Sequence, residues 1–542
     1  MLVLSRRSIA ALALLTGCVG VVEEAQQDYQ SPQDEATATA RDSGRDARAQ
    51  GDAGVSSSFD DGPIESPRTG TGSSGQSPAV NACTKSLEGP LATGLHIREI
   101  ALYQTVKVTL VKDGIWVQKR AAPVVQGKQA LIRVFVDTMA DYRPHNVRAV
   151  LRVESGGKLT ELVDERSLTG SSTDAQLPST FGFQVPGALL TAATKFNVAL
   201  EEISCDEEVG SVGDARYPEG GSQSLEAASI AKLRVVVVPV KVAGRVPVTT
   251  PAELDNMRAA LLAYYPVPDV EVTTRAPLEW PNTLEALDGP SWSNLLTQIM
   301  RERRADGVDD DVYYFGLVQP AATFRAYCQR GCVLGLAPQT TSVMPDAQAG
   351  LGASFADAQT YETMVHELGH AHGRGHAPCV ENGEIDGVDE SYPEPTGNTS
   401  SWGWDSRVNE LQPPTDKDIM GYCDPNWIGA YNYSALAVRS QQVNQKALRV
   451  GVADERWEHV LLYGDKTARW GGLVETRRPS GNVERANVLD AQGRVIDQVE
   501  VVRIPLSHGG DEFLYLPPSQ QGWAALQLAD TKLVLSAIKP AL

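Results

Sequence analysis

The chain has 542 residues, which is too long for one ordinary hydrophobic core and predicts about three folded units joined by linkers. It carries 68 acidic and 48 basic residues, and the resulting formal net charge of −20 repels nucleic acid and anionic lipid surfaces. We therefore expect no nucleic-acid partner, and any attachment to a membrane must come from something other than surface charge.

The first 18 residues have the form of a bacterial export signal. Arg6 and Arg7 precede an apolar run, and the segment ends in Leu15-Thr16-Gly17-Cys18. These four residues resemble the bacterial lipobox, in which the cysteine is acylated and becomes the first residue of the mature protein. We therefore expect a lipoprotein of the bacterial cell envelope, anchored by Cys18 at the outer membrane or cell surface. An ordinary cleaved signal peptide is the alternative.

Composition then divides the chain up to residue 229. Residues 19–82 are small and polar with very little aliphatic content, so they cannot bury enough apolar surface to fold and are expected to form a disordered tether. Residues 83–205 hold short alternating apolar runs between turn-forming residues, which predicts an N-terminal β-sandwich-like domain. Residues 206–229 are rich in Gly, Ser and Glu and are expected to form a linker.

Residues 230–445 mix long strands with helices, which predicts an α+β domain. The runs Leu233–Val242 and Val312–Val318 are expected strands, and Trp292–Arg303 is an expected helix. Thr250-Pro251-Ala252-Glu253 matches a helix-capping box with proline at the first helical position. After residue 445 short strands return, so residues 446–542 are expected to form a C-terminal β-domain.

One segment of the central domain concentrates histidine. His366-Glu367-Leu368-Gly369-His370-Ala371-His372-Gly373-Arg374-Gly375-His376 contains four of the eight histidines of the chain. On a helix, His366 and His370 project from one face about one turn apart, as two ligands of a single ion require. If the helix continued, His376 would lie ~9 Å further along its axis, too far to share a zinc ion. The helix must therefore end between them, and Gly373 can adopt the left-handed backbone that turns the chain back.

This spacing predicts a catalytic zinc site. Three neutral imidazoles, from His366, His370 and His376, leave the fourth tetrahedral position of zinc open to water, unlike a closed structural site. Zinc makes such a water more acidic, and Glu367 is placed to remove its proton as general base. His372 lies on another face of the helix, and we interpret it as a surface or packing residue. The alternative is a histidine-rich helix with no specific metal.

The pattern H-E-x-x-H-x-x-G-x-x-H resembles the metzincin zinc metalloproteases, which also carry a methionine turn beneath the zinc. Asp418-Ile419-Met420-Gly421-Tyr422-Cys423 is similar to that turn. The resemblance implies that Met420 forms the hydrophobic floor under the imidazoles and that the Tyr422 hydroxyl helps to stabilise the oxyanion. A tyrosine that merely packs in the core is the alternative for Tyr422.

The same resemblance, which covers roughly residues 360–435, implies an α+β metzincin-like catalytic domain with a mixed twisted sheet and an active-site helix. The apolar pattern on either side predicts flanking β-sandwich-like domains, so the expected fold is multidomain. The resemblance also implies that Cys328–Ala337 lies at the edge of the sheet, where extended substrate can pair. Ser400-Ser401-Trp402-Gly403-Trp404-Asp405 is similar to the StcE-like bacterial proteases, some of which cut mucin-type glycoproteins. We do not carry that substrate over to this chain.

The cysteines predict disulfides. Of the seven cysteines, six remain after Cys18, an even number in a chain directed to an oxidising compartment. Two bracket the N-terminal domain, and two lie close together at the start of the expected edge segment. The last two follow the third histidine and the methionine by three residues each, in segments that must converge at one zinc. The expected pairs are Cys83–Cys205, Cys328–Cys332 and Cys379–Cys423. A cysteine-ligated zinc site is the alternative, although the C-x-x-C spacing is absent.

Together these residues predict an exported, membrane-anchored zinc metalloendopeptidase acting on extracellular protein or glycoprotein substrates. Two alternatives stay open: a non-catalytic surface binding protein on a relic protease fold, and a zinc amidase acting on peptidoglycan. A decayed site has no need of Glu367, which argues against the relic. The acidic stretches Asp306–Asp311 and Glu384–Glu390 could bind calcium, but neither fits an EF-hand loop and solvated turns are favoured. The oligomeric state is left open.

Overall fold

The computed structural model describes residues 90–203, 214–380, 385–444 and 454–539. The expected signal peptide with Cys18, the expected tether, Glu384 and the expected Cys83–Cys205 pair lie outside these residues. Within the described ranges no helix combines the length and the apolar composition that crossing a membrane requires.

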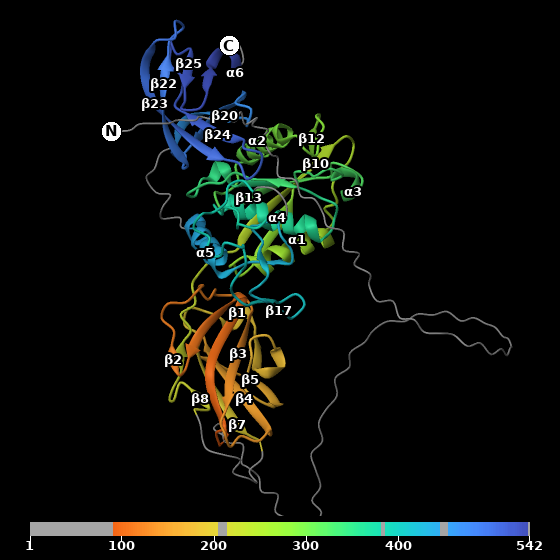
Figure 1. The fold of residues 1–542 in the computed structure, drawn as a ribbon, viewed down its shortest axis with the longest axis vertical. Helices are drawn as coiled ribbons and strands as arrows, with labels where there is room; N and C mark the ends of the chain where they lie inside the picture. The colour runs from red at the N-terminus through yellow and green to blue at the C-terminus, as the bar shows by residue number, and fades with distance from the viewer. Residues whose placement is uncertain (1–89, 204–213, 381–384, 445–453, 540–542) are drawn as a thin grey trace, which may run out of the picture. The chain divides into compact units, whose positions relative to one another are not determined.

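Two antiparallel sheets form the N-terminal part of the described chain (Figure 1). One sheet has the strand order β17-β16-β1-β3-β6 with β2 paired to β1, and the other has the order β5-β4-β7-β8 with β9 paired to β7. Apolar side chains of both sheets share one buried core, as a β-sandwich requires. Their strands are β1 Leu95–Lys112, β2 Ile115–Trp116, β3 Ala130–Thr138, β4 Asn146–Ser155, β5 Lys158–Ser167, β6 Phe181–Val185, β7 Lys195–Glu202, β8 Arg216–Tyr217 and β9 Gln223–Ser224.

Two features of this sandwich differ from the sequence-based expectation. β8 and β9 lie inside the expected linker 206–229, yet both pair with β7 and belong to the sheet. β16 Gly403–Asp405 and β17 Glu410–Gln412 come from the expected protease domain, yet β16 pairs with β1. Strands of two or three residues carry no readable periodicity, so only long-range pairing reveals them.

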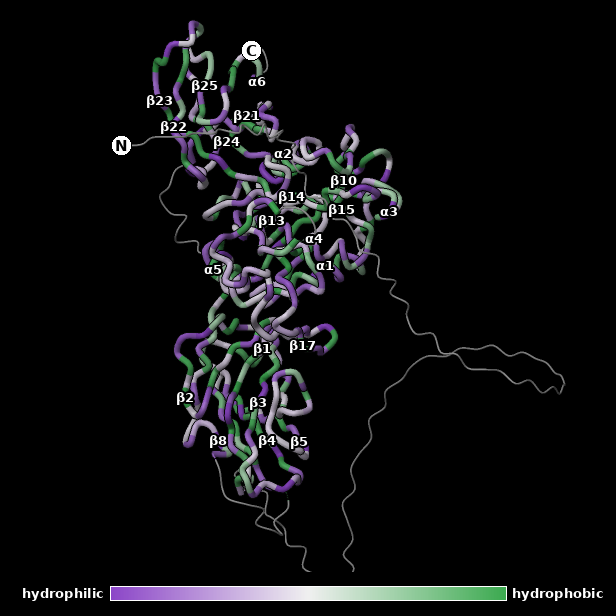
Figure 2. The backbone as a smooth tube through the Cα atoms, viewed as in Figure 1, coloured by the Kyte–Doolittle hydropathy of each residue, from purple (hydrophilic) through white to green (hydrophobic). Residues whose placement is uncertain are grey.

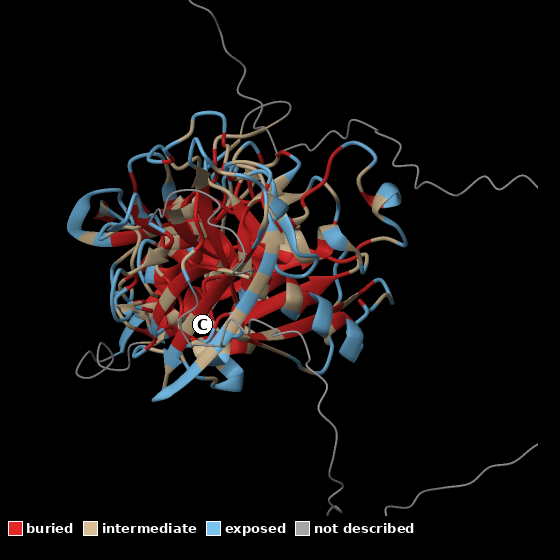
Figure 3. Cartoon of the chain, turned by 90° about the horizontal axis from the view of Figure 1, so that it is seen from below, coloured by how far each residue is buried: buried red, intermediate tan, exposed pale blue. Residues whose placement is uncertain are grey.

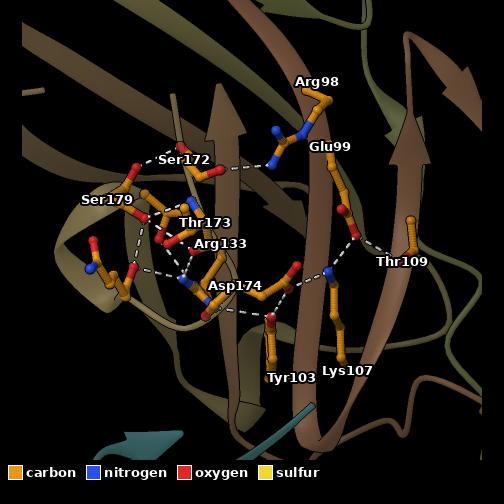
Figure 4. A network of polar contacts seen from close by, with 12 residues as sticks. Arg98, Glu99, Tyr103, Lys107, Thr109, Arg133, Ser172, Thr173, Asp174 and Ser179 are labelled. Atoms are coloured by element: carbon orange, nitrogen blue, oxygen red, sulfur yellow. Dashed lines mark hydrogen bonds and ion pairs between the residues drawn. The ribbon is translucent and has the colours of Figure 1, made fainter. Parts of the chain in front are cut away.

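A buried arginine fixes one loop against the first sheet (Figure 4). Arg133 on β3 is fully buried, and a buried charge without partners would destabilise the fold strongly. The Arg133 guanidinium has such partners: it donates to Tyr103 Oη, Thr180 Oγ1 and the carbonyl oxygens of Thr173, Asp174 and Gln176. Nearby, Lys107 forms ion pairs with Glu99 at 2.9 Å and Asp174 at 2.6 Å.

The central part is built on a mixed sheet with the order β11-β10-β13-β15-β14, and β12 pairs with β10. All pairings are parallel except that of β14, which runs antiparallel to β15 at the edge. The two strands predicted from sequence have the predicted bounds. The strands are β10 Leu233–Val242, β11 Val270–Thr274, β12 Leu278–Trp280, β13 Val312–Val318, β14 Gly335–Leu336 and β15 Ala349–Ala353, and a separate pair is β18 Lys417–Asp418 with β19 Asn426–Trp427.

Helices cover this sheet, and their ends follow local sequence signals. The Thr250 hydroxyl caps the first helix by accepting from Glu253 N at 3.4 Å, as the capping box predicts. The helix expected at Trp292–Arg303 is longer at both ends. The helices are α1 Pro251–Tyr264, α2 Gly289–Asp306, α3 Phe324–Tyr327, α4 Ala358–Ala371 and α5 Ala430–Asn444, and short 3-10 turns lie at Leu177–Ser179, Gly187–Leu189 and Pro345–Ala347.

The C-terminal part is one antiparallel sheet of order β21-β20-β24-β23-β22-β25-β26. Hydrophobic and hydrophilic residues are interleaved along its strands in Figure 2. Across the molecule seen from below, buried residues gather in the interior and exposed residues lie around them (Figure 3). Its Val502, Phe513 and Tyr515 share a buried core with Trp292 and Leu295 of α2, which joins the sheet to the central part. The elements are β20 Glu455–Leu462, β21 Ala468–Thr476, β22 Asn482–Leu489, β23 Val495–Pro505, β24 Glu512–Leu516, β25 Ala525–Gln527, β26 Lys532–Val534 and α6 Leu535–Ile538.

Candidate metal centre

Helix α4 carries the first two histidines of the motif. It follows β15, and Asp357 caps its start by accepting from Thr360 N at 3.0 Å and from Thr360 Oγ1 at 2.9 Å. The helix ends at Ala371, and Gly373 has a φ of 83°, the left-handed conformation that the spacing required. His376 is thereby brought back toward the end of the helix.

The structure brings His366, His370 and His376 together. Nε2 of His370 lies 2.9 Å from Nε2 of His366 and 3.0 Å from Nε2 of His376. All three side chains are buried. Three ring nitrogens from one helix and one loop therefore converge on a single point in the interior.

Backbone carbonyls fix the orientation of these rings. Nδ1 of His366 lies 2.7 Å from Ile419 O, Nδ1 of His370 lies 2.7 Å from Arg374 O, and Nδ1 of His376 contacts Asp386 O. Because a carbonyl only accepts hydrogen bonds, each Nδ1 carries the proton and each Nε2 points a lone pair at the shared point.

The donor set fits a divalent cation. Three lone pairs that face one another at these distances repel unless a cation lies between them. Zn–N bonds of about 2.0–2.1 Å in a tetrahedral site correspond to N–N separations of about 3.3 Å, so the rings need to separate by only a few tenths of an ångström. Burial lowers the pKa of His366 and holds those of His370 and His376 well below the ordinary value, which keeps the rings neutral as ligands must be.

Gly373 is expected to be indispensable to this geometry. A Cβ at this position would clash with the Arg439 guanidinium and lie 2.6 Å from Thr340 O, and the positive φ adds strain of about 1–3 kcal/mol. Gly373→Ala should therefore lower the melting temperature and weaken metal binding by displacing His376. Thermal unfolding and metal titration measure both effects. Gly244→Ala, which has a positive φ but open space, is the matched control, and a Gly373→Ala protein that matched it in both would contradict the account.

The expected methionine turn lies against the same helix. Met420 is buried, and a Cβ built on Gly369 of α4 would lie 2.5 Å from its sulfur, so this glycine lets the thioether approach the helix between two histidines. Met420 O accepts from Ala377 N at 2.9 Å, beside the third histidine. Asp418 holds the turn by accepting from Met420 N at 3.0 Å, and burial raises the pKa of this carboxyl.

Two of the expected disulfides are present. Cys379–Cys423 joins the segment after the third histidine to the end of the methionine turn, with the Cα atoms 5.8 Å apart. Cys328–Cys332 lies before β14, with the Cα atoms 5.0 Å apart. The convergence that the sequence predicted for the segments of Cys379 and Cys423 is therefore observed.

Glu367 lies beside the three rings in a closed polar network. Its Oε2 accepts from Ser507 Oγ at 3.0 Å, and its Oε1 lies 3.1 Å from His508 Nε2. The Tyr422 hydroxyl lies 3.0 Å from His376 Nε2 and 2.6 Å from His508 Nδ1. Burial holds the pKa of Tyr422 well above its ordinary value, so the hydroxyl keeps its proton and remains a donor.

Sequence reasoning missed Ser507 and His508. They lie between β23 and β24, far from the motif in sequence, and Ser507-His508-Gly509-Gly510 matches no pattern that we recognise as functional. The one available signal was that His508 is one of only two histidines in the C-terminal domain, together with His459. In the described residues, one group of His, Cys, Asp or Glu side chains is placed to hold an ion, and it comprises His366, His370, His376 and His508.

Two other expectations are resolved by burial and pairing. His372 is buried and stacks on Tyr313 with ring centroids 4.4 Å apart, so it packs in the core and is not a surface residue. Burial lowers its pKa to about 3.

The acidic stretch 306–311 faces arginines rather than forming an oxygen cage: the pairs are Arg275–Asp306, Arg234–Asp309, Arg234–Asp311 and Arg477–Asp310.

A pocket opens beside Glu367. It is lined by α4, by residues 332–335 before and within β14, and by residues 419–426 of the methionine turn, and it also touches His508. β14 lies inside the expected edge segment and pairs with β15 on one side, although it spans only Gly335 and Leu336. The pocket and the sheet edge therefore meet beside His366 and Glu367.

Comparison with known proteins finds a family model that matches part of the chain. Residues 346–429 match Peptidase M66, and this segment contains the three histidines, Glu367, Met420 and Tyr422. Among solved structures, the chain is similar to metalloproteinase-II from Bacteroides fragilis at 10% identity, over 54% of this chain and 82% of that chain, with a TM-score of 0.21. No curated protein matches the chain. The family match and the buried histidine cluster together support a metallopeptidase that acts on protein.

Proposed function

We propose that the protein is a zinc metalloendopeptidase that hydrolyses internal peptide bonds of extracellular proteins, with Glu367 as general base. The observation that carries this proposal is the convergence of three Nε2 atoms next to a buried carboxylate, a protonated phenol and a pocket. A zinc ion held by His366, His370 and His376 would supply a Lewis acid that polarises the substrate carbonyl and makes a water more acidic.

Glu367 and Tyr422 then have separate tasks. The Glu367 carboxylate takes a proton from the attacking water and passes it to the amine that leaves. Both carboxylate oxygens already face hydrogen-bond donors, so the base is held in one orientation. Tyr422, as a buried hydroxyl that keeps its proton, donates to the oxyanion of the tetrahedral intermediate.

The pocket and the sheet edge suit an extended peptide. A substrate strand can pair with the edge at β14 while one side chain enters the pocket that α4 and the methionine turn enclose. A non-catalytic binding protein would gain nothing from a complete set of ligands, base and phenol in one place. We also propose that the central domain is metzincin-like, which the Met420 contact with α4 and the Gly373 turn support.

Export and anchoring complete the proposal. The sequence Leu15-Thr16-Gly17-Cys18 supports acylation of Cys18 and attachment to the bacterial cell envelope by lipid alone. Substrate in that setting is extracellular protein or glycoprotein.

The experiment that tests the function uses the purified full-length chain loaded with zinc. An unfolded protein and purified peptidoglycan are incubated with it separately, with and without a metal chelator, and the products are identified by mass spectrometry. We expect internal cleavage of the protein that the chelator stops, and intact peptidoglycan. Release of peptidoglycan fragments without protein cleavage would make the amidase alternative correct, and cleavage of neither would favour the binding protein.

Tyr422→Phe is expected to lower kcat by about a hundredfold, the loss typical of one oxyanion donor, with metal content unchanged. The ring stays in the core and only the hydroxyl is removed. Steady-state kinetics on a single peptide measures the effect. Tyr463→Phe is the control: it removes a hydroxyl of the C-terminal domain that donates to Asn294 of α2, and it should behave like the wild type. Unchanged turnover in Tyr422→Phe would reduce Tyr422 to a packing residue.

A further inference from the structure

We propose that the C-terminal β-domain completes the active site by supplying Ser507 and His508 as positioning residues, which hold Glu367 and Tyr422 in their working orientations. This inference rests on the proposed peptidase function and assigns part of the catalytic site to a domain outside the histidine motif.

The loop that carries these residues is anchored to the central domain beside the sheet edge. Ser507 N donates to Ala337 O at 2.9 Å, and Gln339 N donates to Pro505 O at 2.9 Å. The Ser507 hydroxyl also accepts from Ala337 N at 3.0 Å. The end of β23 therefore runs along the segment that follows β14, and its position relative to the active-site helix is fixed by backbone bonds.

The end of the loop that leads into β24 is also held by hydrogen bonds. Leu506 N donates to Asp511 O at 3.0 Å, which closes the loop, and Gly509 and Gly510 have φ values of 81° and 68°. Asp511 accepts from Ser293 of α2 at 2.5 Å in the buried core between the two domains. His508 therefore lies in a tight turn whose two ends are held together by hydrogen bonds.

The hydrogen-bonding chemistry of the His508 ring defines its role. A carboxylate only accepts, so Nε2 of His508 donates to Glu367 Oε1 across 3.1 Å. Nδ1 of the same ring lies 2.6 Å from the Tyr422 hydroxyl. One imidazole thus bridges the proposed base and the proposed oxyanion donor, while Ser507 holds the second oxygen of Glu367.

The supports of the metal ligands and of the base come from different domains. The carbonyls that orient the three histidines belong to Ile419, Arg374 and Asp386, all in the central domain. The donors to Glu367 belong to Ser507 and His508 of the C-terminal domain. Loss of the C-terminal contacts should therefore impair turnover and leave metal binding intact.

The test compares H508L, H508Q and S507A in the full-length chain. H508L removes the polar bridge at similar size, whereas H508Q keeps one donor and one acceptor. We expect kcat of H508L to fall roughly 10–100-fold, the usual cost of losing such a supporting contact, with KM, zinc content and melting temperature close to wild type. H508Q should recover part of kcat, and S507A should lower kcat at unchanged zinc content. H96L, which removes an imidazole that contacts Asp214 in the N-terminal part, should match wild type.

The outcomes separate the possible failures. Wild-type kcat in H508L overturns the inference. If H508L folds poorly, wild-type kcat in S507A overturns it instead. An H508Q protein whose kcat is no higher than that of H508L, at equal stability, also overturns it. Loss of zinc from H508L also overturns it, because His508 would then be a fourth metal ligand. If the wild type itself cleaves no peptide, the proposed function fails. If the wild type cleaves peptide and H508L and S507A cleave it at the same rate, only the inference fails.

Discussion

Replacement of Glu367 by glutamine is expected to reduce peptide hydrolysis by at least about a hundredfold while zinc stays bound. Glutamine has nearly the same size and can still face Ser507 and His508, but it cannot accept a proton from water. The three histidines that would hold the metal keep their own carbonyl partners, so neither metal content nor melting temperature should change. Kinetics and metal analysis on the same preparation measure the two properties together.

A matched control for this change is Glu475→Gln, which neutralises an exposed carboxylate on β21 that forms a surface ion pair with Arg456. It should retain wild-type turnover. A Glu367→Gln protein that kept its zinc and cleaved peptides at the wild-type rate would show that another group acts as base. Loss of zinc from this variant would give Glu367 a structural role instead.

His370→Ala is expected to lose both metal and activity. His370 is the central ligand of the three, since its Nε2 lies within 3.0 Å of the Nε2 atoms of both His366 and His376. Two remaining imidazoles cannot hold zinc tightly against dialysis, and the Lewis acid is then absent. His96→Ala is the control for removal of a distant imidazole. Stoichiometric zinc in dialysed His370→Ala would exclude this histidine from the ligand set.

The motif itself was predictable because its geometry is local. Helical spacing places His366 and His370 on one face, and a third ligand six residues on forces a helix end that Gly373 provides. The Cys379–Cys423 pair followed from the same constraint, because two segments that meet at one ion bring their cysteines together. Strands such as β10 and β13 were also predictable, since buried parallel strands read as long aliphatic runs.

The supports of the site were not predictable, because they depend on contacts between distant segments. Backbone carbonyls such as Ile419 O and Asp386 O carry no side-chain signature, yet they determine which ring nitrogen faces the metal. His508 reaches Glu367 across 141 positions of sequence, through a loop without a motif. β16 joins the N-terminal sheet for a similar reason, since a strand of three residues is defined by its partner.

Return of zinc to the metal-free protein tests the central claim most directly. The full-length chain is stripped of metal, zinc is added in steps, and hydrolysis of one peptide is measured at each step. The account predicts no hydrolysis without metal, a rise in rate with added zinc, and a plateau at one zinc per chain, with no rise in a His370→Ala sample treated in parallel. Full hydrolysis by the metal-free protein, or none at one zinc per chain, would contradict it.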